Sequence, residues 1–388
     1  SDLKKTYVVD TNVLLEDAHC LERLRNGDEN DVIVPYKVIE ELDGLKKDPQ
    51  KRELVLRAVD ALFEHFDQIR FIRDRNLHSN DASMLKTVLA ETSDPVLVTN
   101  DRIFRLLCRI EGINSEEYLS SKPIQSESES YTGFAVEGEP ASPNSFEWVE
   151  GRPHYHSNHG IKVVDYEHEV WKVKPRNKYQ NLAFELLLDP SLDLVTLQSQ
   201  AGYGKTYLAL AAALYLTLEK KLFEKIYVVK SPIEIGPALG FLPGDVLEKL
   251  EPYYRPFYDL VHKLHRLRPA NRIYESEQTG KFDRKVFEVL PLAYIRGMNL
   301  EHAIVIVDEM QNLSRLESRA LLTRMGEGTR CFCLGDTKQV DNPYLNEFNN
   351  GLNWVVTLCK GQPNYGHLVL KGSKSRGVIT DLILKVGL

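Results

Sequence analysis

A glycine-containing loop between a predicted strand and a predicted helix is the feature that most constrains this chain. The loop, residues 199–206, reads Ser-Gln-Ala-Gly-Tyr-Gly-Lys-Thr; it follows the apolar run 194–197 and precedes an alanine- and leucine-rich run, 207–218. Backbone N–H groups of such a loop and of the following helix cradle phosphates. The pattern therefore predicts a P-loop in a nucleotide-binding α/β domain, with an ordinary glycine turn as the alternative.

Residues of this loop have distinct expected tasks. Lys205 is expected to hold the β- and γ-phosphates of a nucleotide, and Thr206 its Mg²⁺ ion. The rest of the loop would line the phosphates through its backbone, and consists of Ser199, Gln200, Ala201, Gly202, Tyr203 and Gly204. Ser199 stands where the usual G-x-x-x-x-G-K-[ST] pattern has glycine, so a positive φ there would be strained.

A second strand with an acidic end follows about a hundred residues downstream. Residues 303–309 read Ala-Ile-Val-Ile-Val-Asp-Glu, an apolar run followed by two acids. This pattern is typical of a buried parallel strand that delivers Asp308 and Glu309 to its carboxyl end. In a Walker B arrangement, Asp308 holds Mg²⁺ and Glu309 acts on the attacking water as a catalytic residue.

Two glutamines complete the expected nucleotide site. The short apolar run 331–334 continues into Gly-Asp-Thr-Lys-Gln at 335–339. It resembles motif III of superfamily 1 helicases, which implies that Gln339 senses the γ-phosphate. Gln180 begins a helical stretch just before the P-loop strand. Its amide both donates and accepts, which suits N6 and N7 of adenine, so the expected cofactor is ATP with Mg²⁺.

Longer motifs extend the resemblance over residues 175–388. They are Leu-Gly-Phe-Leu-Pro-Gly-Asp at 239–245, Tyr-Tyr-Arg-Pro at 253–256, Pro-Leu-Ala-Tyr-Ile-Arg-Gly at 291–297 and Asp-Glu-Met-Gln-Asn at 308–312. In this order they resemble a PhoH-type ATPase. The resemblance implies an ATPase core related to superfamily 1 helicases and assembly into a homo-oligomeric ring, a hexamer.

The N-terminal part of the chain carries acids that follow short apolar runs or precede helical ones. Asp10 ends the run 7–9, and Asp101 lies shortly after the run 96–98. Carboxyl ends of parallel strands meet at one edge of an α/β sheet, where such folds place their sites. Clustered carboxylates repel one another unless divalent cations neutralise them, so the pattern indicates a metal site.

This stretch resembles a PIN domain, a metal-dependent ribonuclease fold. The matches are Val-Asp-Thr-Asn at 9–12, Val-Pro-x-x-Val-Ile-Glu-Glu-Leu-Asp at 34–43, Asn-Asp at 80–81 and Val-Thr-Asn-Asp at 98–101. The resemblance implies that Mg²⁺ or Mn²⁺ is held by the catalytic acids Asp10, Glu41, Asp81 and Asp101. Glu41 is preferred to Glu40 because it directly precedes Leu42. The alternative is that these acids only cap helices.

Length and composition suggest separate domains for the two sites. We expect an α/β protein with a PIN-type sheet domain at 1–120, a linker and small β-domain at 121–174, and a RecA-like parallel-sheet P-loop domain at 175–388. The Ser- and Glu-rich run 115–130 predicts the linker, and short alternating runs at 160–164 and 169–173 predict the β-domain. The absence of long apolar runs predicts no membrane segment. Five cysteines, mostly in apolar runs, are typical of reduced thiols in a cytoplasm.

The net charge of −7 excludes a broadly basic nucleic-acid coat but leaves room for a local basic channel. The cation-rich stretch 262–285 is one candidate, and the tail with Lys371, Lys374 and Arg376 is another; the alternative for each is a solvated surface. Charge on the γ-phosphoryl oxygens also calls for an arginine. The candidates are Arg296, Arg324 and Arg376, with Arg376 preferred and acting across a ring.

The leading hypothesis is an ATP-dependent RNA helicase and endoribonuclease acting on single-stranded RNA or a tailed duplex. ATP hydrolysis would unwind RNA for a PIN site that needs accessible strand. The alternative is a nucleotide-gated regulatory clamp on RNA or ribosomes, in which the PIN domain binds without cutting. A third hypothesis changes the substrate to DNA, since RNA follows only from the resemblance. The sequence leaves open whether an antitoxin-like partner restrains the nuclease.

Overall fold

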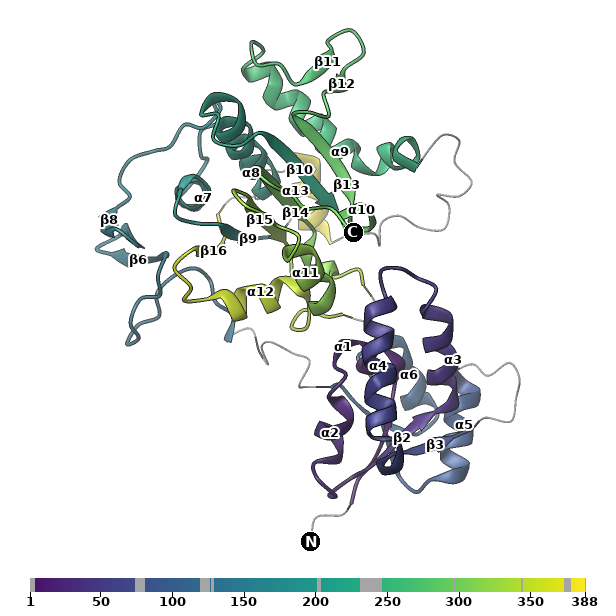
Figure 1. The fold of residues 1–388 in the computed structure, drawn as a ribbon. Helices are drawn as coiled ribbons and strands as arrows, with labels where there is room; N and C mark the ends of the chain where they lie inside the picture. Colours follow the sequence, from purple (N-terminus) through teal and green to yellow (C-terminus); the bar gives the residue numbers. More distant parts are fainter. Residues whose placement is uncertain are drawn as a thin grey trace. The chain divides into compact units, whose positions relative to one another are not determined.

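The computed structural model describes residues 4–73, 81–118, 126, 129–200, 204–230, 246–295, 297–342, 345–372 and 378–387 (Figure 1). Two compact units divide the chain, the first built on residues 1–125 and the second on most of 126–388. Each contains a parallel sheet with helices, which confirms the predicted fold class. Within the described parts, no helix combines the length and apolar character needed to span a bilayer.

The first unit has a five-stranded parallel sheet in the order β3-β2-β1-β4-β5. Its elements are β1 (Thr6–Val9), α1 (Thr11–Glu16), α2 (Cys20–Arg25), β2 (Asp31–Pro35), α3 (Tyr36–Leu45), α4 (Arg52–Glu64), the 3₁₀ turn η1 (Phe66–Gln68), β3 (Arg70–Ile72), α5 (Asp81–Glu91), β4 (Pro95–Val98), α6 (Arg102–Ile110) and β5 (Asn114–Glu116). Because β5 includes Ser115 and Glu116, the first residues of the Ser- and Glu-rich run belong to this sheet.

Hydrophobic side chains cover both faces of this sheet. Polar side chains that could bind a ligand are therefore expected at the ends of its strands. In β2, Val32 and Val34 pack in one cluster with α1–α4, while Ile33 packs in the other with α5 and α6. Strand side chains alternate between faces, so an all-apolar strand is buried on both. After β3 the chain returns to the other side of β1 to form β4. The ends of β1 and β4 therefore flank the point where the strand order reverses, where such sheets place ligands.

The second unit has a six-stranded parallel sheet in the order β13-β10-β14-β15-β9-β16. The elements of the chain from residue 145 are β6 (Ser145–Val149), β7 (Arg152–Ser157), β8 (Gly160–Val163), α7 (Lys178–Leu188), β9 (Leu194–Gln198), α8 (Lys205–Leu214), the π-helical turn η4 (Tyr215–Glu219), β10 (Lys225–Lys230), α9 (Val246–Leu267), β11 (Tyr274–Ser276), β12 (Lys281–Phe282), β13 (Phe287–Pro291), α10 (Leu292–Ile295), β14 (Ala303–Asp308), the 3₁₀ turn η7 (Met310–Asn312), α11 (Arg315–Leu322), β15 (Arg330–Gly335), α12 (Gly351–Cys359), β16 (Tyr365–Val369) and α13 (Val378–Val386).

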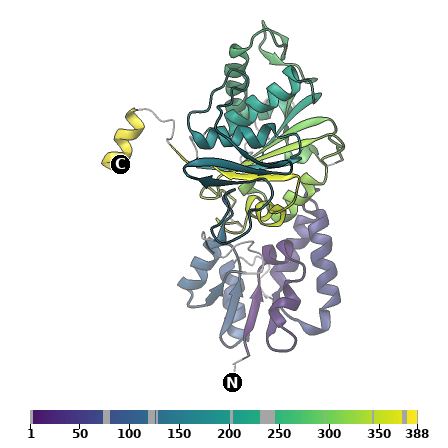
Figure 2. The same cartoon turned by 90° about the vertical axis from the view of Figure 1, so that its left-hand side faces the viewer.

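Two clusters of buried side chains cover the faces of this sheet. One joins the sheet to α7, α8 and α9, and the other joins it to η7, α11 and α12. Figure 2 shows helices on both faces of this sheet. The P-loop strand β9 and the acidic strand β14 are separated by β15 alone. The helix α9 and the hairpin β11–β12 are inserted between neighbouring strands β10 and β13 (Figure 1).

The region before α7 contains a three-stranded antiparallel sheet, β6-β7-β8. Phe146 and Tyr155 from this sheet belong to the same hydrophobic cluster as α7 and α8. The predicted strand at 169–173 is wrong: Val170 and Val173 hydrogen-bond to each other across a tight turn. At the turn Trp171 has φ 53° and its buried indole Nε1 donates to the Leu264 carbonyl at 2.8 Å. Alternating polarity predicted a strand, whereas one long-range indole contact fixes the turn.

Candidate functional sites

Asp10 lies between β1 and α1, at the centre of the first sheet's carboxyl edge. Its carboxylate accepts a hydrogen bond from the Thr11 backbone N–H at 2.8 Å and another from the Thr99 hydroxyl at 2.7 Å. Thr99 follows β4 and is fully buried. One threonine hydroxyl therefore ties the carboxylate after β1 to the end of the neighbouring strand β4.

Two further acids join this network. The Thr11 hydroxyl donates to Glu41 Oε2 at 2.5 Å, and the Asp101 backbone N–H donates to the Thr99 hydroxyl at 3.1 Å. A continuous chain of contacts thus runs from Glu41 through Thr11, Asp10 and Thr99 to Asp101. Asp81 begins α5, but its side chain lies outside what the structure describes.

Asp10 and Asp101 each cap a helix and also belong to the cluster of acids. Asp10 caps α1, and the Asp101 carboxylate caps α6 by accepting from the Ile103 N–H at 2.9 Å. Capping uses one carboxylate oxygen at Asp101 and leaves the other oxygen for a ligand. The capping alternative is therefore correct as a description of these two residues, yet it does not exclude a metal site.

The charge of this cluster suits a divalent cation. The Glu41 and Asp10 carboxylates accept from the neutral hydroxyls of Thr11 and Thr99, and Lys37 Nζ approaches Glu41 Oε1 at 3.5 Å. Asp101 joins the network through its backbone N–H. Clustered carboxylates repel one another, and carboxylate oxygens are the ligands that Mg²⁺ and Mn²⁺ prefer. The donor set of Asp10, Glu41 and Asp101 therefore fits a bound divalent metal.

The described part of the P-loop has the geometry expected for phosphate binding. Gly204 begins α8 with φ 82°, a conformation that favours glycine. Lys205 Nζ donates to the Ser199 carbonyl at 3.2 Å, so the lysine folds back over the loop. Ser199 is not among the non-glycine residues with positive φ, so the strain considered for this position does not arise. Thr206 is half-buried in the first turn of α8, and residues 201–203 lie outside the described chain.

Gln180 lies against this loop. It is nearly buried in the first turn of α7, and its Oε1 accepts from the Arg176 backbone N–H at 2.8 Å. A methyl group built on Gly204 would come within 3.1 Å of Gln180 Nε2. The structure therefore brings the predicted adenine-binding residue next to the predicted phosphate loop, although they are separated by a strand in the sequence.

Asp308 is the buried acid of the second site. It ends β14 and pairs in register with Lys230, the last residue of β10. Burial, reinforced by the neighbouring charge of Glu309, raises the pKa of Asp308 to about 7, and the ammonium groups of Lys230 and Lys205 oppose that rise. A carboxylate this strongly desolvated gains from a cation, so the donor fits a Mg²⁺ ion accompanying a nucleotide.

The Gln311 side chain links the remaining predicted site residues. Its Nε2 donates to Glu309 Oε2 at 2.5 Å and to the Gln339 carbonyl at 3.2 Å, while its Oε1 accepts from the Asp336 N–H at 3.1 Å. This fully buried amide therefore links the strand-end acid to the loop after β15. Glu309 itself has φ 54°, a left-handed conformation that is uncommon outside glycine and often found at functional sites.

The loop after β15 faces the P-loop strand. Gln198 Nε2 donates to the Thr337 hydroxyl at 3.1 Å, which joins β9 to this loop. Buried Asp336 Oδ2 has no hydrogen-bond partner within the described chain, as expected of a group that awaits a ligand or water. Gln339 is exposed at the end of the loop, where it is free of the core. Of the three finger candidates, Arg324 is exposed after α11, and Arg296 and Arg376 lie outside the described residues.

Sequence reasoning missed residues that support these acids. They are Thr11, Thr99, Lys230 and Gln311. Thr11 and Thr99 stood inside the quoted motifs, and their position next to the acids was a usable signal. Lys230 carried a weaker signal, a lysine that ends an apolar run.

The two sites define a nucleotide-binding ATPase with a nuclease-like domain. A model of the PIN domain matches residues 7–119, and a model of PhoH-like proteins matches residues 172–385. Protein PhoH2 of Bacillus subtilis is 31% identical over 446 residues, covering 96% of this chain and 98% of that protein. Protein PhoH2 of Thermobispora bispora is 29% identical, covering 98% and 96%. The chain therefore belongs to the family of PhoH-like proteins that carry an N-terminal PIN domain.

Proposed function

We propose that this protein is an ATP-driven RNA-remodelling ribonuclease. ATP hydrolysis in the second unit would unwind or pull RNA, and the first unit would cleave it. The observation that carries the proposal is the hydrogen-bonded chain from Glu41 through Asp10 to Asp101, which gathers three PIN-type acids at one sheet edge. A domain that served only to bind RNA would have no need to hold carboxylates together against their repulsion.

For RNA cleavage, the residues divide into metal ligands and supports. Asp10, Glu41 and Asp101, together with Asp81, would hold Mg²⁺ or Mn²⁺, which supplies an activated water and neutralises the phosphodiester charge. The hydroxyls of Thr11 and Thr99 fix the orientation of the carboxylates, as supporting hydrogen bonds commonly do in metal sites.

For ATP hydrolysis, Gln180 would bind adenine and Lys205 the phosphates, with Thr206 and Asp308 as Mg²⁺ ligands. Glu309 would orient the attacking water, and the Gln311 amide would hold the Glu309 carboxylate in place. Gln339, whose backbone carbonyl also accepts from Gln311, would sense the γ-phosphate. A change at Glu309 during hydrolysis would then reach the loop after β15 through the buried Gln311 amide.

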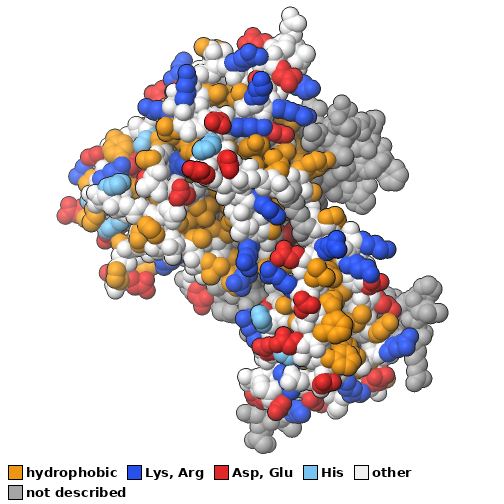
Figure 3. Space-filling view, in the orientation of Figure 1, with side chains coloured by type: hydrophobic (Ala, Val, Ile, Leu, Met, Phe, Trp, Pro, Cys, Tyr) orange, Lys and Arg blue, Asp and Glu red, His pale blue; other side chains and the backbone are white. Residues whose placement is uncertain are grey.

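A basic surface on α9 and β11–β12 is the proposed path for RNA on the second unit. Lys and Arg side chains lie over these elements in Figure 3, with Asp and Glu side chains among them. The exposed cations there are Lys263, Arg266, Arg272, Lys281, Arg284 and Lys285. Lys263 Nζ also lies 5.1 Å from the ring centre of Tyr207, in the first turn of the P-loop helix α8. A change in α8 on nucleotide binding would thus reach the RNA surface directly.

The proposal includes a homo-oligomeric ring, a hexamer, with Arg376 contributed across the subunit interface. An arginine finger stabilises charge on the transferred phosphoryl group. We expect Arg376→Ala to slow ATP hydrolysis while nucleotide affinity stays nearly unchanged, measured by turnover and by equilibrium binding of a fluorescent ATP analogue. A tenfold loss of nucleotide affinity would instead make Arg376 a ground-state ligand.

The deciding experiment uses a labelled hairpin RNA with a single-stranded tail. Wild type and Asp10→Ala are incubated with Mg²⁺ or Mn²⁺, with and without ATP. Cleavage that requires Asp10, and that reaches into the duplex only with ATP, supports the coupled nuclease and motor. ATP consumption without Asp10-dependent cleavage under either metal contradicts it and favours the regulatory clamp. A parallel DNA hairpin tests whether the 2′-hydroxyl matters.

A further inference from the structure

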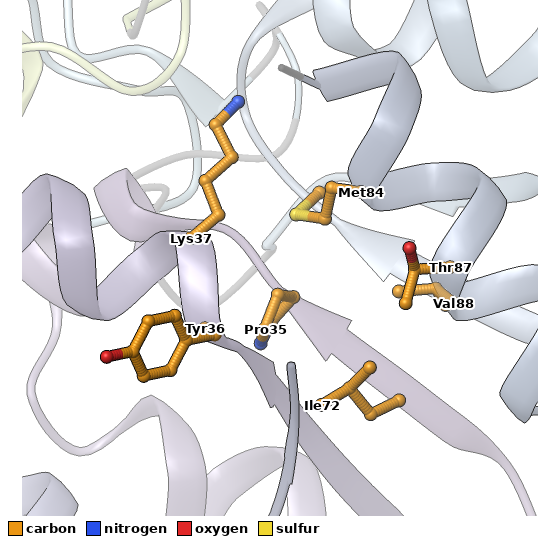
Figure 4. A pocket seen from close by; sticks show the side chains of 7 residues that line it. All are labelled: Pro35, Tyr36, Lys37, Ile72, Met84, Thr87 and Val88. Carbon is orange, nitrogen blue, oxygen red and sulfur yellow. The ribbon is translucent and has the colours of Figure 1, made fainter. Parts of the chain in front are cut away.

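Helices on both faces of the first sheet leave apolar side chains exposed on their outer surfaces. At the end of this sheet, the gap among Pro35, Ile72 and Met84 leaves no room for a water molecule, and Ile72 and Met84 are buried (Figure 4). That gap therefore gives a partner nothing to enter. The surfaces to consider for association are the outer faces of the helices.

On α6 the exposed apolar side chains form one stripe. Ile103, Leu106 and Ile110 recur at helical spacing and are 56–73% exposed, while Phe104 and Cys108 pack in the core. Monomeric soluble proteins rarely expose contiguous apolar patches on this pattern. The second, outward stripe of α6 therefore indicates an interaction surface.

Positive charge accompanies this stripe. Arg102 and Arg109 are exposed, and neither forms an ion pair within the part of the chain that the structure describes. At 100° per residue, they and the three apolar residues fall within about 120° of the helix circumference. The helix contains no acidic residue. We call Arg102, Ile103, Leu106, Arg109 and Ile110 the α6 surface.

A second apolar stripe lies on α4, and it carries the opposite charge. Leu56 and Phe63 are 55% and 75% exposed, and exposed Phe66 follows the helix. Asp60 and Glu64 follow Leu56 at intervals of four residues and are exposed beside the stripe. Figure 3 shows hydrophobic side chains over α4 with acidic side chains next to them. We call these five residues the α4 surface.

The two surfaces complement each other but cannot meet within one first unit. The helix α4 packs on the face of the sheet that carries Val32 and Val34, and α6 packs on the face that carries Ile33. Of the cations on α4, Arg57 already pairs with Glu53 at 3.0 Å. The acids of the α4 surface therefore suit the arginines of an α6 surface from another copy.

We propose that copies of this chain associate head to tail through their first units, with the α6 surface of one copy packed against the α4 surface of the next. Such a heterologous contact leaves one surface of each kind free at the ends of an open assembly, and a ring forms where the rotation closes. The contact gives the ring of the proposed function a defined interface, and rests on that function only for the expectation that copies associate. In a closed ring every copy uses both surfaces at once, which reinforces contacts that are small one by one.

The test uses two charge reversals in the full-length protein, with assembly followed by sedimentation velocity over a concentration series. Arg102→Glu/Arg109→Glu sets acids against acids, and Asp60→Arg/Glu64→Arg sets arginines against arginines. Either variant alone should need at least about tenfold more protein to assemble, because like charges repel across the contact. An equimolar mixture of the two variants should assemble as wild type does, since each altered surface then meets one of opposite sign.

The matched control is Lys46→Glu/Lys47→Glu, which reverses two exposed lysines of the same unit just after α3. It should assemble as wild type does, and circular dichroism verifies that every variant is folded. Equal assembly of wild type and both reversal variants would overturn the contact. A mixture that assembles no better than its two components would overturn it as well.

The same measurements separate failure of this contact from failure of the ring. A closed wild-type assembly that neither reversal weakens keeps the ring and overturns the contact between first units. Open wild-type chains of growing length, lost in both reversal variants, support the contact and overturn the closed ring. A wild type that stays monomeric at every concentration overturns both.

Discussion

Both parallel sheets of this protein carry acids at their carboxyl edges, but the two edges balance that charge differently. In the first unit, Asp10 is held by a backbone N–H and the Thr99 hydroxyl. In the second, Asp308 is buried and lies within the influence of two lysines, Lys205 and Lys230. Among the described residues, hydroxyl and backbone donors surround Asp10, with Lys37 beside Glu41, whereas at the second edge Asp308 lies within the influence of two lysines, whose charge also suits phosphates.

The largest expected effect is loss of the ATPase activity assigned to the second edge without loss of the RNA cleavage assigned to the first. Lys205→Ala should reduce ATP hydrolysis on the order of a hundredfold or more, since one charged donor to the transition state is lost. Cleavage of unstructured RNA should persist, because the acid network contains no group from the P-loop. Phosphate release and cleavage of a single-stranded oligonucleotide measure the two activities. The control is Lys220→Ala, which changes an exposed lysine after α8. Loss of both activities in Lys205→Ala would contradict the independence of the two sites.

The reverse separation tests the first edge. Asp10→Asn keeps an oxygen that can accept from Thr11 but removes the charge that a metal needs, so RNA cleavage should fall on the order of a hundredfold. ATP hydrolysis should stay at the wild-type rate. Asp31→Asn changes an exposed acid that pairs with Lys4 outside the network, and serves as the control. Retained cleavage in Asp10→Asn would remove Asp10 from the metal site.

A substitution of Gln311 tests whether this buried amide positions Glu309 at the second edge, as threonine hydroxyls position Glu41 and Asp10 at the first. Gln311→Glu replaces the donor to Glu309 with a like charge, so ATP turnover should fall by roughly ten- to a hundredfold. Nucleotide affinity should change little, because Lys205 and Gln180 are untouched. Turnover and equilibrium binding are measured side by side, with thermal unfolding to verify folding. Gln278→Glu, exposed in the β11–β12 hairpin, is the control; a matching loss of affinity would assign Gln311 to nucleotide binding instead.

A substitution of Thr99 tests whether its hydroxyl positions the acids of the first edge. Thr99→Val removes the hydroxyl shared by Asp10 and Asp101, so the metal concentration for half-maximal cleavage should rise about tenfold. ATP hydrolysis should not change. Metal titrations of the cleavage rate provide the measurement, and Thr92→Val removes a hydroxyl that only bonds the Val88 carbonyl. An unchanged metal requirement in Thr99→Val would mean that the hydroxyl does not organise the acids.

A difference in acid stability is the smallest predicted effect. Burial lowers the pKa of His367, on β16 of the second sheet, to about 4. The unfolded chain then binds the proton more readily, so stability is lost as pH falls below ~6.5, by about 2 kcal/mol at pH 5. His367→Gln should flatten the dependence of the melting temperature on pH, whereas exposed His159→Gln should not. Parallel curves for wild type and His367→Gln would contradict this assignment.

Local patterns predicted most of the fold because strand and helix periodicity survive in short segments. The apolar runs before Asp10, Asp308 and Gly335 all form buried strands, as expected. The failure at 169–173 has a physical cause: an alternating segment of five residues carries no information about the distant carbonyl that its tryptophan reaches. Such a contact outweighs a strand preference that is worth little on its own.

The sequence by itself determined the chemistry of this protein: the P-loop, the strand-end acids and their order along the chain. Those features are local, since a phosphate loop or a strand end is built from consecutive residues. The tertiary structure decided which side chains support them. Lys230 meets Asp308 through strand register, and Thr99 meets Asp10 across neighbouring strands. Register and strand order are set by packing of the whole sheet, so no single segment contains them.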